Sequence, residues 1–287
     1  MHPTNAILRI VKAMRPWPEV AQRVLTLVQD PNYAIDDLVA LIRTDTTLVA
    51  RVLRLCNSAR SGLDHEITAI GDAVTYVGTR NLVQLTLVSC SAATFASAPT
   101  SAYTDPKALW HHSLACALLS QELAQQLGVV SPPTAFTAGI LHDIGRVVLG
   151  QLATNPGLPS DDPHTAPPRA HELLEREVFG MDHAEVAGLV GDAWRLPTTL
   201  VEALRTHHVE AAMLAADELP AILHVADQLA LQQGLAVPFR RATATISPVA
   251  LARLELTPDQ LAPIAARATA EMQRTVDLLN LEANGCR

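Results

Sequence analysis

Apolar residues recur every three or four positions along most of the chain, which is the spacing of one buried helix face. No stretch alternates apolar and polar residues as a half-buried strand would. The first predicted helix opens at Pro18-Glu19 and closes at Asp30-Pro31. Four more are expected at residues 35–42, 46–58, 67–77 and 81–95, with Gly78 dividing the last two. The pattern predicts an all-α fold.

A stretch rich in Ala, Ser, Pro and Thr at residues 96–106 is the best candidate boundary. Beyond it, helices are expected at 109–127, 135–152, 170–179, 183–194, 198–207, 219–234 and about 257–281, with a five-proline loop at 155–168. We therefore predict a helical unit at 1–100, a second at 101–237 and a C-terminal helical extension at 238–287. The extension could pack back onto the domain or form a dimer contact.

Composition and charge restrict the class of protein. Apolar residues make up 49% of the 287 residues and charged residues 17%, as in a globular protein. The net charge of −8 argues against general nucleic-acid binding, which needs clustered Lys and Arg. The four cysteines contain no CxxC pair, and three lie in apolar helical stretches, where a reduced Cys acts as a small hydrophobe. With no signal peptide and no apolar run long enough for a bilayer, we expect a cytoplasmic protein without membrane contact.

Histidines gather in the second half of the chain, where eight of the eleven fall between His111 and His208. Imidazole and carboxylate are ligands that Mn, Fe and Zn accept, and helices that converge on one point can present them together. The ordered candidate metal ligands are His112, His142, Asp143, His183, His207, His208 and Asp227.

Each candidate ligand also has an ordinary structural explanation. His112 shares a helix face with Cys116, so burial in the core could account for it. Asp227 is within helical reach of His224, and the two could satisfy each other. The His207-His208 pair could be a polar helix end, where imidazolium complements the dipole. The ordered set is stronger evidence for a site than any of its members.

Several segments of the chain resemble HDOD domains. The resemblance lies in Arg15-Pro16-Trp17-Pro18-Glu19, in IRTDTTLVARVLRLCNS at 42–58 and ITAIGDAVTYVG at 67–78, and then in Trp110-His111-His112-Ser113, LHDIGR at 141–146, HAEVAGLVGDAWRLP at 183–197, THH at 206–208 and HVADQLA at 224–230. It covers roughly residues 15–235. The resemblance implies an N-terminal HDOD bundle followed by a helical domain like those of the HD superfamily, related to the HD-GYP phosphodiesterases.

The same resemblance places all seven candidate ligands at ligand-type positions of an HD-GYP-like site. Arg146 stands where HD-GYP enzymes have Lys, and it is a candidate for holding phosphate. Val209-Glu210-Ala211-Ala212 follows the histidine pair, where those enzymes carry a Gly-Tyr-Pro substrate loop. The sequence therefore does not predict a cyclic di-GMP hydrolase.

Two functions of different classes follow. The favoured one is a bacterial regulatory HDOD protein, a binding or output module that docks a signalling partner and is not an enzyme, with or without a retained site for Mn, Fe or Zn and with a nucleotide as a further candidate ligand. The alternative is a metal-dependent phosphohydrolase acting on a nucleotide or phosphodiester. A third reading is a metal that only clamps helices together.

Overall fold

The computed structural model describes residues 3–30, 32–58, 67–101, 103–153, 171–209, 217–235 and 244–284. Within these ranges the regular elements are helices and no strand occurs, so the predicted all-α fold is confirmed. The first six helices are α1 (Pro3–Ala13), α2 (Glu19–Leu27), α3 (Ile35–Ile42), α4 (Thr46–Ser58), α5 (Ile70–Val77) and α6 (Thr79–Phe95). The others are α7 (Pro106–Leu127), α8 (Pro132–Leu141), α9 (Ile144–Leu152), α10 (His171–Phe179), α11 (His183–Ala193), α12 (Thr198–Thr206), α14 (Leu219–Gln232), α15 (Pro248–Arg253) and α16 (Pro258–Asn284).

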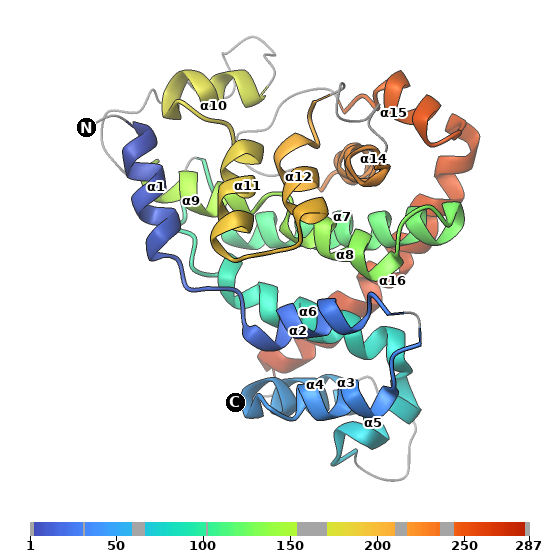
Figure 1. Cartoon of the computed structure of the whole chain (residues 1–287). Coiled ribbons are helices and arrows are strands. Elements are labelled where there is room, and N and C mark those ends of the chain that lie inside the picture. The colour runs from blue at the N-terminus through green and yellow to red at the C-terminus, as the bar shows by residue number, and fades with distance from the viewer. Residues whose placement is uncertain are drawn as a thin grey trace.

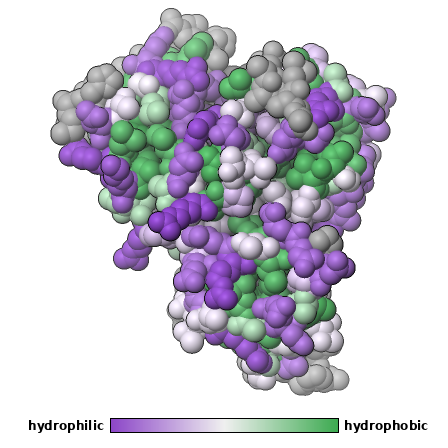
Figure 2. All heavy atoms as spheres, viewed as in Figure 1, coloured by the Kyte–Doolittle hydropathy of each residue, from purple (hydrophilic) through white to green (hydrophobic). Residues whose placement is uncertain are grey.

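The helices form a narrower lower part and a broader upper part in the view of Figure 1. Helices α2 to α6 make up the lower part, while α7 to α12, α14 and α15 make up the upper part. Helix α1 lies in the upper part and packs against α9 and α11, although it opens the chain. Figure 2 shows the same two parts, with apolar side chains in separate patches among hydrophilic ones on the face in view.

The helix ends carry the capping groups that their sequences imply. The Asp105 side chain accepts hydrogen bonds from the backbone N–H groups of residues 107 and 108 and so caps α7. Helix α7 ends at Gly128, which has a left-handed conformation with φ of 69°. Asp182 and Glu185 form a reciprocal capping box at the start of α11. Capping fixes where α7 and α11 begin, and both helices carry candidate ligands.

Two glycines allow the helices of the upper part to approach closely. A Cβ atom at Gly139 in α8 would lie 2.5 Å from the Cα atom of Ala117 in α7. A Cβ atom at Gly145 in α9 would lie 2.0 Å from the carbonyl oxygen of His183 in α11. Because neither position has room for a side chain, glycine sets the distance between these helices. The candidate ligands on α7, on α11 and in the break between α8 and α9 are brought together in this way.

The prediction of one helix over residues 135–152 is wrong, because the chain forms α8 and α9 with a break between them. Asp143 lies in the break, with φ of −93° and ψ of 11°. Apolar buried residues continue through the break, so the pattern gave no sign of it. The break gives His142 and Asp143 directions that a straight helix would not allow.

Two further helices were not expected from the sequence. Helix α1 buries Ile7 and Val11, which are one helical turn apart. Helix α15 starts with Pro248, and the Ser247 side chain caps it by accepting from the N–H of Val249. The predicted five-proline loop at 155–168 lies outside the described residues.

The C-terminal helix packs back onto the rest of the chain. Helix α16 contacts α7 in the upper part and α4 in the lower part. Leu261, Ile264 and Ala268 form its buried face, and Arg267 pairs with Glu122 at 3.0 Å. Of the two arrangements left open by the sequence, the structure shows packing within the chain. The division at residues 100 and 237 stays a prediction.

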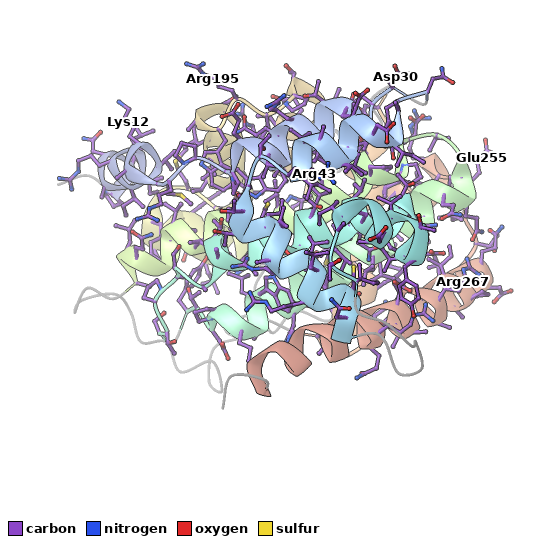
Figure 3. All side chains as sticks on the ribbon, turned by 90° about the horizontal axis from the view of Figure 1, so that it is seen from below. Lys12, Asp30, Arg43, Arg195, Glu255 and Arg267 are labelled. Carbon is purple, nitrogen blue, oxygen red and sulfur yellow. The ribbon has the colours of Figure 1, made fainter. Side chains whose placement is uncertain are left out.

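Charged side chains are distributed over the surface. The six that Figure 3 labels come from different elements or turns, and all are exposed: Lys12, Asp30, Arg43, Arg195, Glu255 and Arg267. Among the described helices, none has both the length and the apolar character that crossing a membrane requires.

Candidate metal centre

The structure brings all seven candidate ligands together in the upper part of the molecule. Helix α7 supplies His112, the break after α8 supplies His142 and Asp143, and the first residue of α11 is His183. His207 and His208 follow α12, and Asp227 lies in the middle of α14. Six of the seven are fully buried, namely His112, His142, Asp143, His183, His207 and Asp227. The seventh, His208, has a side chain that is 12% exposed.

Four histidines share one hydrogen-bonding arrangement. The Nδ1 atom of each faces an acceptor: the carbonyl oxygen of Leu235 for His112 (2.7 Å), of Gly139 for His142 (2.8 Å) and of Leu204 for His207 (2.8 Å), and the carboxylate of Glu175 for His183 (2.6 Å). Since these oxygens only accept, each Nδ1 must carry the proton. In the neutral ring, Nε2 then carries a lone pair. Metal-binding histidines are held in this way.

The Nε2 atoms converge on groups that are also acceptors. The Nε2 atom of His112 lies 3.1 Å from Oδ1 of Asp227, and that of His142 lies 3.6 Å from Oδ2 of Asp143. The Nε2 atoms of His183 and His208 are 2.9 Å apart. Lone pairs that face lone pairs and carboxylates repel unless a proton or a cation lies between them. The arrangement is therefore suited to a cation.

Within the part of the chain that the structure describes, three buried atoms in the cluster have no hydrogen-bond partner: Nε2 of His142, Oδ2 of Asp143 and Nε2 of His207. Each belongs to a residue with no exposed surface, and one ligand atom from each of the three residues lies within 4.8 Å of the others. An unpaired buried polar atom costs about 1–3 kcal/mol, so three at one point need an explanation. A metal ion bound among them would supply one. The residues present therefore fit a metal.

Asp143 is kept ionised by its neighbours. Burial alone would raise its pKa, but the Arg146 guanidinium, with Nε at 2.9 Å from Oδ1, and the nearby histidines outweigh burial. The pKa of Asp143 is therefore held well below its usual range. A carboxylate that stays charged while buried is a strong cation ligand.

The histidines differ in their tendency to take a proton. Burial lowers the pKa of His142, and it lowers that of His207 much further, so both rings stay neutral. Burial also acts to lower the pKa of His183, but the carboxylates of Glu175 and Asp143 outweigh it and the net shift is upward. Neutral imidazole is the form that binds metals.

Sequence reasoning missed Glu175, which lies on α10 and is fully buried. Its Oε2 accepts from the backbone N–H of His183 (2.7 Å) and from Nδ1 of the same residue. Its Oε1 accepts from the hydroxyl of Tyr103 (2.7 Å) and lies 3.2 Å from NH1 of Arg146. Glu175 stands in the polar sequence HELLEREVF, where nothing distinguishes it from its exposed neighbours.

Cys116 and Gln228 were also missed. The Sγ atom of Cys116 lies 3.5 Å from Nε2 of His112, one helical turn earlier on α7. The side-chain amide of Gln228 donates to Oδ2 of Asp227 at 2.9 Å. The i, i+4 spacing from a candidate ligand was the signal for Cys116, but its apolar surroundings favoured the interpretation as a hydrophobe.

Arg146, the predicted phosphate-holding residue, has only 1% of its surface exposed. Its Nε and NH1 atoms pair with Asp143 and Glu175, and its guanidinium carbon lies 6.0 Å from the centre of the Tyr103 ring. These buried carboxylates raise the pKa of Arg146 despite the opposing effect of burial. Arg146 therefore pairs with the buried carboxylates of Asp143 and Glu175 and balances their charge.

An all-helical fold with His and Asp side chains from five segments converging on a buried centre defines a protein of the HD class. The sequence pattern of the HDOD domain matches residues 14–210, which is more than half of the chain. The chain belongs to the HDOD domain family.

Three solved structures are similar over nearly all of this chain. A provisionally assigned phosphohydrolase from Shewanella amazonensis SB2B is 25% identical with a TM-score of 0.68, covering 95% of this chain and 96% of that one. An HDOD domain protein of unknown function from Geobacter sulfurreducens is 23% identical with a TM-score of 0.66, covering 98% and 95%. A provisionally assigned signal transduction protein from Marinobacter aquaeolei VT8 is 21% identical with a TM-score of 0.70, covering 94% and 59%. The last two, at these identities, show the shared fold.

A curated relative from Treponema pallidum (strain Nichols) is 27% identical over 206 residues. The match covers 67% of this chain but only 37% of the relative. The chain therefore spans little more than a third of the length of that protein.

Proposed function

We propose that this chain is a regulatory HDOD module that binds a signalling partner and retains a metal centre in its histidine-rich half. Membership of the HDOD family supports the regulatory role. The metal centre is supported by three buried ligand atoms that have no hydrogen-bond partner among the described residues, together with four histidines whose Nδ1 atoms face acceptors.

Two neighbouring groups of residues would hold metal. One is formed by His112, His142 and Asp227, and the other by His183, His207 and His208, with Asp143 between them. Mn, Fe and Zn all accept this mixture of imidazole and carboxylate. When bound, such an ion can activate water or shield the charge of a phosphate.

The burial of the site favours binding over turnover. A substrate must reach the reacting atoms, yet only His208 among the seven ligands has an exposed part. Arg146, which could have held a phosphate, is occupied by Asp143 and Glu175. We therefore propose that Arg146 holds Asp143 in position rather than binding phosphate. For the same reason we favour a regulatory function over a catalytic one.

The alternative function is a metal-dependent phosphohydrolase acting on a nucleotide or phosphodiester. The similarity to the Shewanella protein at 25% identity and the complete ligand set favour it. A metal-loaded protein that turns over any member of a panel of nucleotides and cyclic dinucleotides would establish this alternative and overturn the non-enzymatic proposal.

The first experiment is to measure the metal content of untagged protein by mass spectrometry beside the H142A/D143A double variant. About one or two ions of Mn, Fe or Zn per chain are expected in the wild type and none in the double variant. His111→Ala is the matched control, since His111 is only half-buried and neighbours His112 without belonging to the cluster. A wild-type protein that takes up no ion after incubation with each metal would refute the metal centre.

The partner is expected to bind the segment at residues 67–80, which includes α5 in the lower part. Tyr76 is the large exposed apolar side chain of this segment, with 44% of its surface accessible. Tyr76→Ala should abolish capture of the partner from the source cell extract. Val129→Ala should not, although Val129, in the upper part, is also an exposed apolar residue, with 49% of its surface accessible. Capture that is the same for both variants would exclude this surface.

A further inference from the structure

Cys116 lies on the side of the cluster formed by α7 and α14. One ligand atom each from His112, Cys116, His142 and Asp227 lies within 4.8 Å of the others, and all four residues are buried. Cys116 follows His112 by one helical turn, so α7 presents both side chains on the same face. Cys116 forms no disulfide with Cys56 or Cys90, the other cysteines of the described residues.

The distances in this group fit a four-coordinate ion. Bond lengths of about 2.3 Å for Zn–S and about 2.0 Å for Zn–N place a sulfur and a nitrogen roughly 3.5 Å apart around a tetrahedral centre. The Sγ atom of Cys116 is 3.5 Å from Nε2 of His112. The Nε2 atom of His112 is 3.1 Å from Oδ1 of Asp227, and that of His142 is 3.8 Å from the same oxygen.

A thiol hydrogen bond to His112 would leave part of the cluster unexplained. Such a bond would satisfy the Nε2 lone pair of His112 alone, whereas Nε2 of His142 is fully buried and has no hydrogen-bond partner among the described residues. A single ion bound to Cys116, His112 and His142 would account for both lone pairs and for the approach of the Asp227 carboxylate.

We propose that Cys116 is a thiolate ligand of this centre and makes its α7 side selective for zinc over manganese. The inference rests on the proposed metal centre and adds a ligand that determines which metal ion the centre prefers. Sulfur ligands favour Zn and Fe, while carboxylate and water suit Mn. On binding, the thiol proton leaves to solvent and the ion takes its place on sulfur.

The decisive experiment uses wild-type protein freed of metal and then titrated with Co(II) under reducing conditions. Thiolate ligation gives an intense sulfur-to-cobalt charge-transfer band in the near ultraviolet, and tetrahedral coordination gives visible bands. X-ray absorption of the zinc form should show a sulfur neighbour at about 2.3 Å besides nitrogen and oxygen at about 2.0–2.2 Å. Both measurements use the wild type and need no variant to fold.

The variants are Cys116→Ser, with Cys90→Ser as matched control. Cys90 is also a buried helical cysteine, but it lies on α6, and burial raises its pKa to about 12. Cys116→Ser should lose the charge-transfer band and bind zinc about tenfold more weakly or worse, with manganese affinity changed less than about twofold. Cys90→Ser should keep the band.

The two hypotheses fail in different ways. Cobalt bound with visible bands but without a charge-transfer band would refute the Cys116 ligand and leave the metal centre standing. Protein that binds no cobalt, zinc or manganese would refute both. A charge-transfer band that persists in Cys116→Ser and disappears in Cys90→Ser would show that the sulfur ligand comes from Cys90 on α6. This result would overturn the inference.

Discussion

At the scale of single residues, Glu175 connects His183 of the candidate ligand cluster to Tyr103 and Arg146 beside it. Its carboxylate accepts from the backbone and ring of His183, accepts from Tyr103 and pairs with Arg146. A carboxylate held by this many donors fixes the orientation of the imidazole ring that is bonded to it. His183 therefore owes its tautomer and orientation to a residue eight positions earlier, on α10.

Replacing Glu175 by Gln should weaken both stability and metal binding. The amide offers one acceptor oxygen and leaves Arg146 with one buried carboxylate partner fewer, at a cost of about 3 kcal/mol in the free energy of unfolding. The metal affinity of the proposed site at His183 should fall by about 10–100-fold. Urea unfolding and metal titration measure the two effects.

The control is Glu177→Gln on the same helix, where the side chain is exposed. It should change unfolding by less than about 0.5 kcal/mol. Equal effects of the two substitutions would show that Glu175 has no special role.

At the scale of elements, the approach of α9 to α11 brings Asp143 within 3.3 Å of His183. Gly145 permits this approach because any side chain there would collide with the backbone of His183. Gly145→Ala should force the two helices apart, destabilise the fold by about 2–3 kcal/mol and lower metal affinity. Thermal unfolding with and without zinc checks both.

Gly71→Ala is the matched substitution for this prediction. Gly71 lies in α5, and a Cβ atom there would meet no neighbouring atom within 4 Å, so alanine should stabilise the helix by about 0.5 kcal/mol. If Gly145→Ala behaved like Gly71→Ala, the helices would not be in contact as described.

Most of the helices could be predicted from the sequence, although α1 and α15 were not, and the candidate ligands could be identified, while the residues that support them could not. The spacing of apolar residues indicates which face of each helix is buried, so His112 and Asp227 could be identified as polar residues on buried faces. It does not reveal which helix packs against that face, so neither Gly145 nor Glu175 had a recognisable role. The break at His142-Asp143 was hidden because the residues on both sides are buried and apolar.

At the scale of the whole molecule, α16 and α1 connect its parts. Helix α16 packs on α7 and α4, while α1 packs on α9 and α11 before the chain passes to the lower part. Ile264, on the buried face of α16, has no exposed surface. Contacts of α16 therefore join the upper part to the lower one, while α1 packs within the upper part and the chain that follows it leads to α2 in the lower part.

Ile264→Ala should lower the free energy of unfolding by about 2–4 kcal/mol, because it leaves a cavity between α16 and its neighbours. Arg267 lies on α16 as well and pairs with Glu122 of α7 at the surface, so Arg267→Ala should cost less than about 1 kcal/mol. Chemical unfolding of the two variants compares them. A smaller loss for Ile264→Ala than for Arg267→Ala would contradict the packing of α16.

The complete burial of His112, His142 and Asp227 has a consequence for timing. With the proposed metal in place, solvent cannot reach the ion until surrounding helices separate, so exchange proceeds at the rate of local opening rather than of diffusion. An ion acquired while the chain folds would then be kept through later changes in the metal supply. The metal content of each molecule would then reflect the ions that were present when it folded.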